Sequence, residues 1–230
     1  LIDVMGAIPS DEFDELKKST QMQNDYHLLT NDTYRITYIG MNSRKGKLAD
    51  RKTRQAIAHL ADVEQIIKLT LKGYGRPTVG FIHPQDSNYN QELTPFAHST
   101  ERASQLLTEA GWRQEDGQWL RTQSSGEDEV LNLRLSYASG SAAYENTALM
   151  FANAATQLGI EVELIPMERR SFIQSLRSHD FELFISSKSG SPSAYNFMQF
   201  LHSRAAREGG ANYTGFGNAE SDALVSHLAY

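Results

Sequence analysis

Hydrophobic positions along the chain follow two different periodicities. Apolar side chains recur every three or four residues in six segments, which predicts amphipathic helices over 10–18, 50–61, 62–73, 99–111, 141–159 and 168–178. They alternate with polar residues, or run together, in five others, which predicts strands over 25–41, 119–121, 129–137, 160–164 and 181–185. Asn31-Asp32 is a turn signal, so the first of these strand segments is expected to form a hairpin. Interleaved helices and strands predict the α/β class, with a mixed sheet of the α+β kind.

Local signals mark where several helices begin and end. Asp50, Asp62, Ser99 and Ser141 each stand directly before a helical segment, where a side-chain oxygen can accept a hydrogen bond from a free backbone N–H group. Between the second and third of these helices, residues 73–98 are rich in glycine and proline and have no periodicity. Long irregular stretches of this kind are usually functional or cover a partner surface.

Composition narrows the class of protein further. The chain has 230 residues and no internal repeat or linker, so we expect a single domain, residues 1–230. It has no cysteine, which excludes zinc–thiolate sites, disulfides and cysteine nucleophiles. A net charge of −6 lacks the basic footprint of a nucleic-acid binder. No apolar run approaches the roughly 18 residues of a membrane span, so direct membrane insertion is not expected.

Motifs for cofactors and catalysis are missing from the sequence. No two histidines stand four residues apart, so a metal site has little support, and there is no phosphate loop or nucleophile elbow. Gly73-Tyr74-Gly75 is followed by Thr78 where a dinucleotide-binding fingerprint needs a third glycine. The segment 186–191, with Lys188 among several serines, leaves two alternatives: a Ser–Lys hydrolase, or a flexible polar loop after a strand. We therefore expect that the protein binds no cofactor or metal and is not an enzyme.

A series of short motifs occurs in a specific order along nearly the whole chain. They are Tyr38-Ile39-Gly40-Met41-Asn42, Asp50–Ile57, Gly73-Tyr74-Gly75-Arg76-Pro77, Glu109-Ala110-Gly111-Trp112, Leu158–Leu164, Asp180-Phe181-Glu182-Leu183 and Asn212–Asn218. This succession resembles family 5 of the extracellular solute-binding proteins, the dipeptide and oligopeptide receptors of ABC importers. Each motif is weak alone, and their order makes the resemblance specific.

The resemblance implies an architecture and a cellular role. Proteins of this family have two lobes that enclose a ligand as they close, and the similarity covers only the second lobe, which is inserted into the first. The expected fold is therefore a lobe of the class II periplasmic binding protein kind, truncated at both termini. The implied function is that of a periplasmic or extracellular, possibly lipid-anchored, receptor that delivers a peptide or other small solute to ABC permease subunits.

The sequence departs from the peptide-binding members at two anchor positions. Those members place a Trp and then an Asp, which pairs with the ligand's α-amino group, where this chain has Lys188 and Ser191. The dipeptide receptors hold the ligand carboxylate with an Arg near the start of the helix matching 141–158, where this chain has Tyr144-Glu145-Asn146. A buried ammonium without a carboxylate partner costs several kcal/mol, so either the ligand is not held by peptide termini or another residue takes over. Lys188 favours a ligand with a carboxylate, phosphate or carbonyl group, unless it points to water.

These comparisons give a set of candidate ligand contacts and one alternative function. The residues expected to face the cleft are Tyr137, Ser139, Lys188, Ser189, Ser191, Tyr195 and Asn212. For Asn212, hydrogen bonding to ligand and to backbone are equally compatible with its loop position. The alternative function is the sensor domain of a transcription regulator, which an upstream helix-turn-helix would indicate, whereas a signal peptide would indicate transport.

Overall fold

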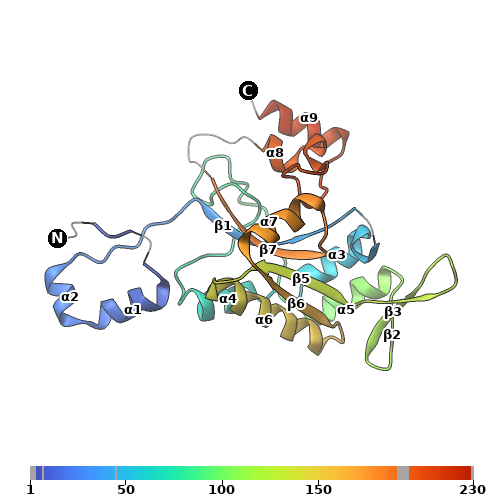
Figure 1. Ribbon diagram of the computed structural model, residues 1–230, viewed down its shortest axis with the longest axis horizontal. Coiled ribbons are helices and arrows are strands. Elements are labelled where there is room, and N and C mark those ends of the chain that lie inside the picture. Colours follow the sequence, from blue (N-terminus) through green and yellow to red (C-terminus); the bar gives the residue numbers. More distant parts are fainter. Residues whose placement is uncertain (1–3, 7, 45, 191–196, 229–230) are drawn as a thin grey trace.

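A four-stranded mixed sheet forms the centre of the molecule. The computed structural model describes residues 4–6, 8–44, 46–190 and 197–228. The sheet consists of β1 (Arg35–Met41), β5 (Leu133–Ala138), β6 (Val162–Met167) and β7 (Leu183–Ser189), in the order β1-β7-β5-β6 (Figure 1). β5 runs parallel to β6 and β7, and β1 is antiparallel to β7. The predicted fold class, α/β with a mixed sheet, is confirmed.

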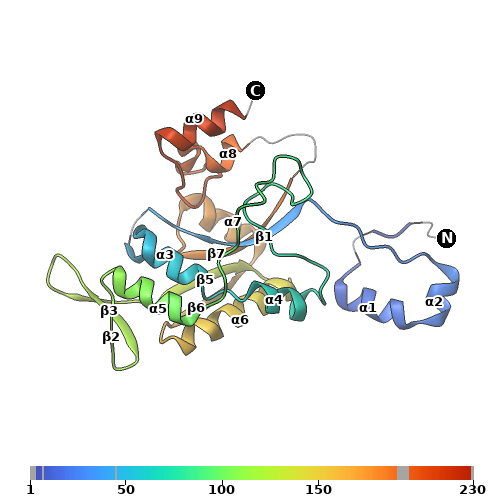
Figure 2. The ribbon, with the colours of Figure 1, turned by 180° about the vertical axis from the view of Figure 1, so that it is seen from behind.

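Helices cover both faces of this sheet. One face carries α3 (Arg51–Ala58), α5 (Thr100–Glu109) and α6 (Ala142–Gln157), and α4 (Val63–Thr70) packs on α6. α7 (Arg169–Ser178) lies on the opposite face (Figures 1 and 2). Because side chains alternate along a strand, Leu183 and Ile185 of β7 join the larger core, whereas Phe184 joins the smaller core under α7. Gly40 of β1 makes room for Phe184, since a Cβ at Gly40 would come within 2.3 Å of that ring.

The helix starts predicted from capping residues are confirmed. Asp50 accepts a hydrogen bond from the backbone N–H of Thr53, and Asp62 accepts one from that of Gln65. Ser99 and Ser141 occupy the same position before α5 and α6. Between α4 and α5 the chain forms no helix or strand, in agreement with the aperiodic sequence of 73–98. No helix within the described residues is long and apolar enough to cross a membrane.

The hairpin expected over 25–41 does not form. Its first part contains the end of α2 (Thr20–Asp25) and an irregular segment, and only β1 is a strand. β1 pairs with β7 instead, in a register that places Thr37 opposite Ser187. The turn residues Asn31-Asp32 lie outside the two elements. A local turn signal was therefore outweighed by a partner strand that is distant in the sequence.

A small antiparallel sheet extends from one end of the molecule. It is formed by β2 (Arg113–Glu115), β3 (Gln118–Thr122) and β4 (Asp128–Val130). The single strand expected over 129–137 is wrong, because the chain leaves this sheet after Val130 and enters the central sheet as β5. The β2–β3 turn packs on the end of α6, where a Cβ at Gly159 would lie 2.1 Å from the Gly117 carbonyl oxygen.

Short helices lie at both ends of the described chain. α1 (Ser10–Lys18) and α2 project from the body, and Phe13 of α1 packs edge-to-face on Tyr74 at 5.4 Å (Figure 1). The helix predicted over 10–18 is confirmed, and Pro9 stands at its N-cap position. The remaining elements are η1 (Gly46–Ala49), α8 (Met198–Leu201), η2 (Ser203–Ala206) and α9 (Ala219–His227).

Candidate ligand-binding site

The carboxyl ends of β5, β6 and β7 meet at one edge of the central sheet. From β5 the chain passes through α6 to β6 on one side, and from β6 it crosses through α7 to β7 on the other side of β5. The two connections run on opposite faces of the sheet (Figures 1 and 2). The strand order therefore reverses between β5 and β7, and open α/β sheets bind ligands outside the strand ends at such a point.

Three hydroxyl groups are linked at this edge. Thr37 Oγ1 lies 2.8 Å from Ser187 Oγ, and Ser187 Oγ lies 2.7 Å from the hydroxyl of Tyr144. We call Thr37, Tyr144 and Ser187 the hydroxyl row. Thr37 and Ser187 lie on the face of β1 and β7 that carries the larger core, two residues from Ile39 and Ile185. Tyr144 lies in the first turn of α6. Because each hydroxyl can both donate and accept, the row presents adaptable partners for polar ligand groups.

Lys188 points to the other face of β7, where it lies over an aromatic cluster. Its Nζ is 3.9 Å from the centre of the Phe200 ring, a cation–π geometry. Phe200 in turn contacts Phe81, from the irregular segment 73–98, and Phe81 contacts Tyr38 of β1, with ring centres 5.3 and 5.5 Å apart. Burial lowers the pKa of Lys188 below its ordinary value. Of the two alternatives for Lys188, the one in which it points freely to water does not fit, since the side chain is half-buried against this cluster.

Burial also affects the titration of two tyrosines near the same edge. Tyr38, in the aromatic cluster, has its pKa raised to about 12 because burial disfavours its phenolate form. Tyr137 on β5 is 5% exposed and belongs to the larger core. Burial, with a contribution from the negative charge of Glu145, raises the pKa of Tyr137. Both phenols are therefore neutral hydrogen-bonding groups at physiological pH.

The other predicted contacts are placed as follows. Ser139 and Ser189 are exposed at the strand ends, and the backbone N–H of Ser139 donates to the carbonyl of Met167 at 2.8 Å. Ser191 and Tyr195 lie outside the described residues. The structure thus brings Tyr137, Ser139, Lys188 and Ser189 to one end of the sheet, although Lys188 is on the opposite face from the hydroxyl row.

Asn212 is separate from this edge and has a structural position. Its side chain is fully buried by this chain alone. Nδ2 donates to the carbonyls of His202 and Phe216, at 3.2 and 2.7 Å, and Oδ1 accepts from the N–H of Gly215 and the hydroxyl of Thr214, at 3.1 and 3.3 Å. All four bonds are internal to the C-terminal segment. Of the two alternatives for Asn212, the structure selects hydrogen bonding to the protein itself, and we withdraw it as a ligand contact.

Arg44 is a residue whose role the sequence does not reveal. Its guanidinium donates to the carbonyls of Ala206, Asn212 and Tyr213. Arg44 therefore holds the C-terminal segment against the end of β1. Burial lowers the pKa of Arg44, and the carbonyl acceptors replace the water that it loses. Since those acceptors are backbone groups far along the chain, no residue pattern around Arg44 indicates the contact.

The geometry gives no support to hydrolase chemistry at residues 186–190. These residues are not the flexible loop that the sequence suggested, because β7 continues as far as Ser189. Lys188 consequently points away from Ser187 and Ser189, which lie on the opposite face of the strand. Ser187 is already hydrogen-bonded to Thr37 and Tyr144. Within the described residues, no group of three or more acidic or histidine side chains could hold a metal ion.

The mixed sheet, with helices on both faces and polar side chains at its strand reversal, defines an α/β fold with a candidate ligand-binding edge. Residues 2–208 match the family of bacterial extracellular solute-binding proteins, family 5 (middle part), and the chain belongs to this family. The resemblance proposed from the sequence motifs is confirmed. Proteins of this family are extracellular binding proteins of transport systems rather than enzymes.

Individual relatives agree with this assignment. The chain is 26% identical over 214 residues to the oligopeptide-binding protein AppA of Bacillus subtilis, which covers 90% of this chain and 38% of that protein. It is 24% identical over 182 residues to the dipeptide-binding protein of Escherichia coli, which covers 78% of this chain and 32% of that protein. The chain thus spans less than half of the length of these relatives.

Solved structures show the same fold. The structure of Bacillus subtilis AppA in complex with a nonapeptide matches with a TM-score of 0.75 and 26% identity, over 87% of this chain and 40% of that one. HbpA2 of Haemophilus parasuis matches with a TM-score of 0.80 and 20% identity, over 99% and 42% of the two chains. The second likeness shows the fold alone. Together they confirm the expected fold, a mixed α/β architecture like that of the family 5 binding proteins.

Proposed function

We propose that this chain is the inserted, second lobe of a two-lobe receptor that binds peptides or other small solutes outside the cytoplasm and delivers them to an ABC permease. The observation that carries the proposal is the match to the middle part of family 5 over residues 2–208. Relatives named for oligopeptide and dipeptide binding, each much longer than this chain, support it. A periplasmic or membrane-anchored location follows from the same proposal.

In this proposal the ligand lies across the hydroxyl row at the end of the central sheet. Thr37 is exposed there, and Ser187 and Tyr144 are partly exposed. Hydroxyl groups suit the main-chain amides of a peptide, which need both donors and acceptors and are common to all sequences. The reversal of strand order between β5 and β7 supports placing the ligand at this edge.

Charged groups beside the row offer partners for the ligand's ends. Arg35, exposed and opposite Ser189 in the sheet, provides a cation for a carboxylate. Glu145, in the first turn of α6 and close enough to raise the pKa of Tyr137, provides an anion for an ammonium group. These two residues would replace the terminal anchors that this chain lacks. Binding would then be completed by closure of the other lobe, without covalent chemistry.

Because one lobe provides only one wall of the cleft, this chain alone should bind weakly. Small ligands are usually 70–90% buried in their sites, and a single wall cannot achieve this. The test is a titration of the 15N-labelled chain with pentaalanine and with nonapeptides, followed by NMR chemical shifts. We expect Kd values above about 100 μM and shifts concentrated at Thr37, Tyr144, Ser187 and Ser189.

Matched variants sharpen this titration. Ser187→Ala removes the central hydroxyl and should weaken peptide binding by about fivefold, whereas Ser178→Ala, an exposed serine at the end of α7, should leave it unchanged. Shifts confined to surfaces away from the hydroxyl row, or sub-micromolar affinity of this chain alone, would contradict the proposal. Absence of any peptide-dependent shift at millimolar concentration would contradict the placement of the peptide on the hydroxyl row.

A further inference from the structure

Five arginines gather along α7 and η2, and α7 lies on the opposite face of the sheet from the hydroxyl row. Arg169, Arg170 and Arg177 are exposed on α7, with Ile173 and Gln174 between them. Arg204 and Arg207 are exposed in and after η2. The two groups adjoin, because the backbone N–H of Gly209 donates to the carbonyl of Arg177 at 3.0 Å. We call these five residues the arginine surface.

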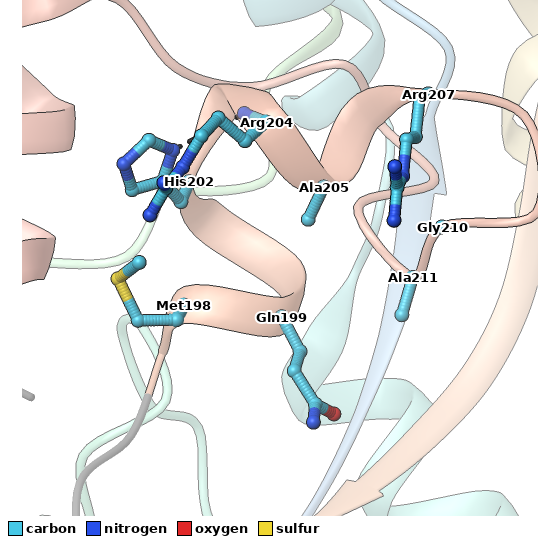
Figure 3. Close-up of a pocket in the computed structure, with 8 residues that line it drawn as sticks. All are labelled: Met198, Gln199, His202, Arg204, Ala205, Arg207, Gly210 and Ala211. Carbon is cyan, nitrogen blue, oxygen red and sulfur yellow. Dashed lines mark hydrogen bonds between the residues drawn. The ribbon is translucent and has the colours of Figure 1, made fainter.

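Two shallow, open hollows lie on the arginine surface. One hollow of about 330 Å³ lies between α8, η2 and the segment that follows, and Arg204 and Arg207 are among the residues around it (Figure 3). A second hollow, of about 570 Å³, lies along α7 between Arg169, Arg170 and Arg177. Each hollow has room for one or more side chains of another molecule.

The acidic residues beside this surface, Glu168, Glu208 and Asp222, are fewer than its five arginines. Within the described part of the chain, none of the five arginines forms an ion pair within 4 Å. Glu168 is the one acidic residue that lines the two hollows, and its carboxylate already accepts from the N–H groups of Arg170 and Ser171. Asp222, whose pKa Arg204 helps to lower, is bonded to Ser203. Such a concentration of charge is unusual in a chain with a net charge of −6.

We propose that the arginine surface is a docking site for an acidic segment of a partner protein. Both hollows are lined by arginine and neither by lysine, and guanidinium groups bind carboxylates in pairs of parallel hydrogen bonds. The two shallow hollows have the volume to take Asp or Glu side chains of such a segment. The surface runs from the start of α7, which follows β6 at the edge of the sheet, to η2, and a Ser187→Ala control therefore distinguishes binding of the probe here from binding at the proposed peptide site.

The test uses a synthetic acidic segment as the probe. A fluorescein-labelled hexaglutamate, acetylated and amidated at its ends, is titrated with the 230-residue chain and followed by fluorescence anisotropy. We expect saturable binding that weakens at least tenfold between 50 and 300 mM salt, because exposed charges are screened. Arg170→Gln/Arg177→Gln should weaken it at least fivefold, and Arg51→Gln/Arg102→Gln, which removes the same charge elsewhere, less than twofold.

Several results would overturn the proposal. Equal losses in the two double variants would mean that only the overall charge matters. Wild-type binding that is absent or unsaturable, or binding of phosphatidylglycerol vesicles in place of the peptide, would exclude an acidic protein segment. The Arg170 and Arg177 side chains are exposed on a helix, and circular dichroism verifies that the variant is folded. By contrast, an unchanged affinity of Ser187→Ala for the hexaglutamate probe is expected, because it would show that the probe does not occupy the proposed peptide site.

Discussion

Replacing Asn212 separates its structural role from a role in ligand contact. In Asn212→Ala, the carbonyls of His202 and Phe216 lose their donor, and the N–H of Gly215 and the hydroxyl of Thr214 lose their acceptor. A typical net contribution is about 1 kcal/mol per hydrogen bond, and a buried group left unpaired costs more. Some of the freed groups will bind water, so we expect the free energy of unfolding to fall by about 3 kcal/mol.

Urea unfolding followed by tryptophan fluorescence measures this loss. Trp112 and Trp119 are 1% and 3% exposed, so unfolding exposes both indoles to water. With a urea m-value of about 3 kcal/mol/M, the midpoint should be about 1 M lower than in the unmodified chain. Asn153→Ala, on the exposed side of α6, is the matched control and should change stability by less than about 0.5 kcal/mol.

The outcome that refutes this reasoning is specific. If Asn212→Ala lowers stability by less than about 1 kcal/mol, the four bonds contribute little net stability, and the buried position has another cause. If the variant remains stable and instead loses peptide-dependent NMR shifts, Asn212 contacts the ligand after all. A destabilised variant that still shows those shifts agrees with the structure.

Three further predictions concern buried polar groups. Thr53→Val removes the hydroxyl that accepts a hydrogen bond from the buried indole N–H of Trp112 at 2.9 Å. In urea unfolding, the free energy of unfolding should fall by about 1–3 kcal/mol, and a fall below about 0.5 kcal/mol would contradict this prediction. Burial and the charge of Arg44 lower the pKa of His179 in the folded chain below 6.5. As the pH drops below about 7, the imidazole is therefore protonated more readily in the unfolded chain than in the folded one, and the free energy of unfolding should fall. His179→Asn, which tolerates the left-handed backbone there, should reduce this slope in urea titrations between pH 5 and 7, and an unchanged slope would exclude His179 as its source. Burial also lowers the pKa of Lys188 below 10.5, so just below pH 10.5 the unfolded chain binds more protons than the folded one, and the free energy of unfolding should rise with pH. In Lys188→Met this rise should be missing between pH 8 and 10. Identical slopes of the free energy of unfolding against pH in the two proteins would show that the ammonium is fully solvated.

Features that depend on neighbouring residues could be predicted from the sequence. The starts of α3, α4, α5 and α6 follow from one capping side chain and the N–H groups two or three residues later. The existence of strands near β5, β6 and β7 follows from the apolar positions of 129–137, 160–164 and 181–185, although their bounds and their parallel direction do not. The family resemblance then supplied the arrangement that local patterns cannot give.

Pairing between distant segments could not be predicted in the same way. β1 finds its partner in β7, and the polar residues 186–189 continue that strand because β1 supplies their hydrogen bonds. Once they are in a strand, Ser187 and Lys188 must point to opposite faces, which divides the candidate site between two surfaces. The acceptors of Arg44 and the contacts of Asn212 likewise depend on how the C-terminal segment folds back.

The pairing of β1 with β7 also has a consequence for how the chain is made. Thr37 and Ser187 are 150 positions apart, so a ribosome adds the whole intervening sequence before the first strand meets its neighbour. At about 5–20 residues per second, this takes roughly 8 to 30 seconds. During that interval the backbone of β1 has no ladder partner, and an unpaired strand can associate with other nascent chains. Folding of this chain should therefore benefit from chaperones that keep nascent chains apart until residue 189 has been synthesised.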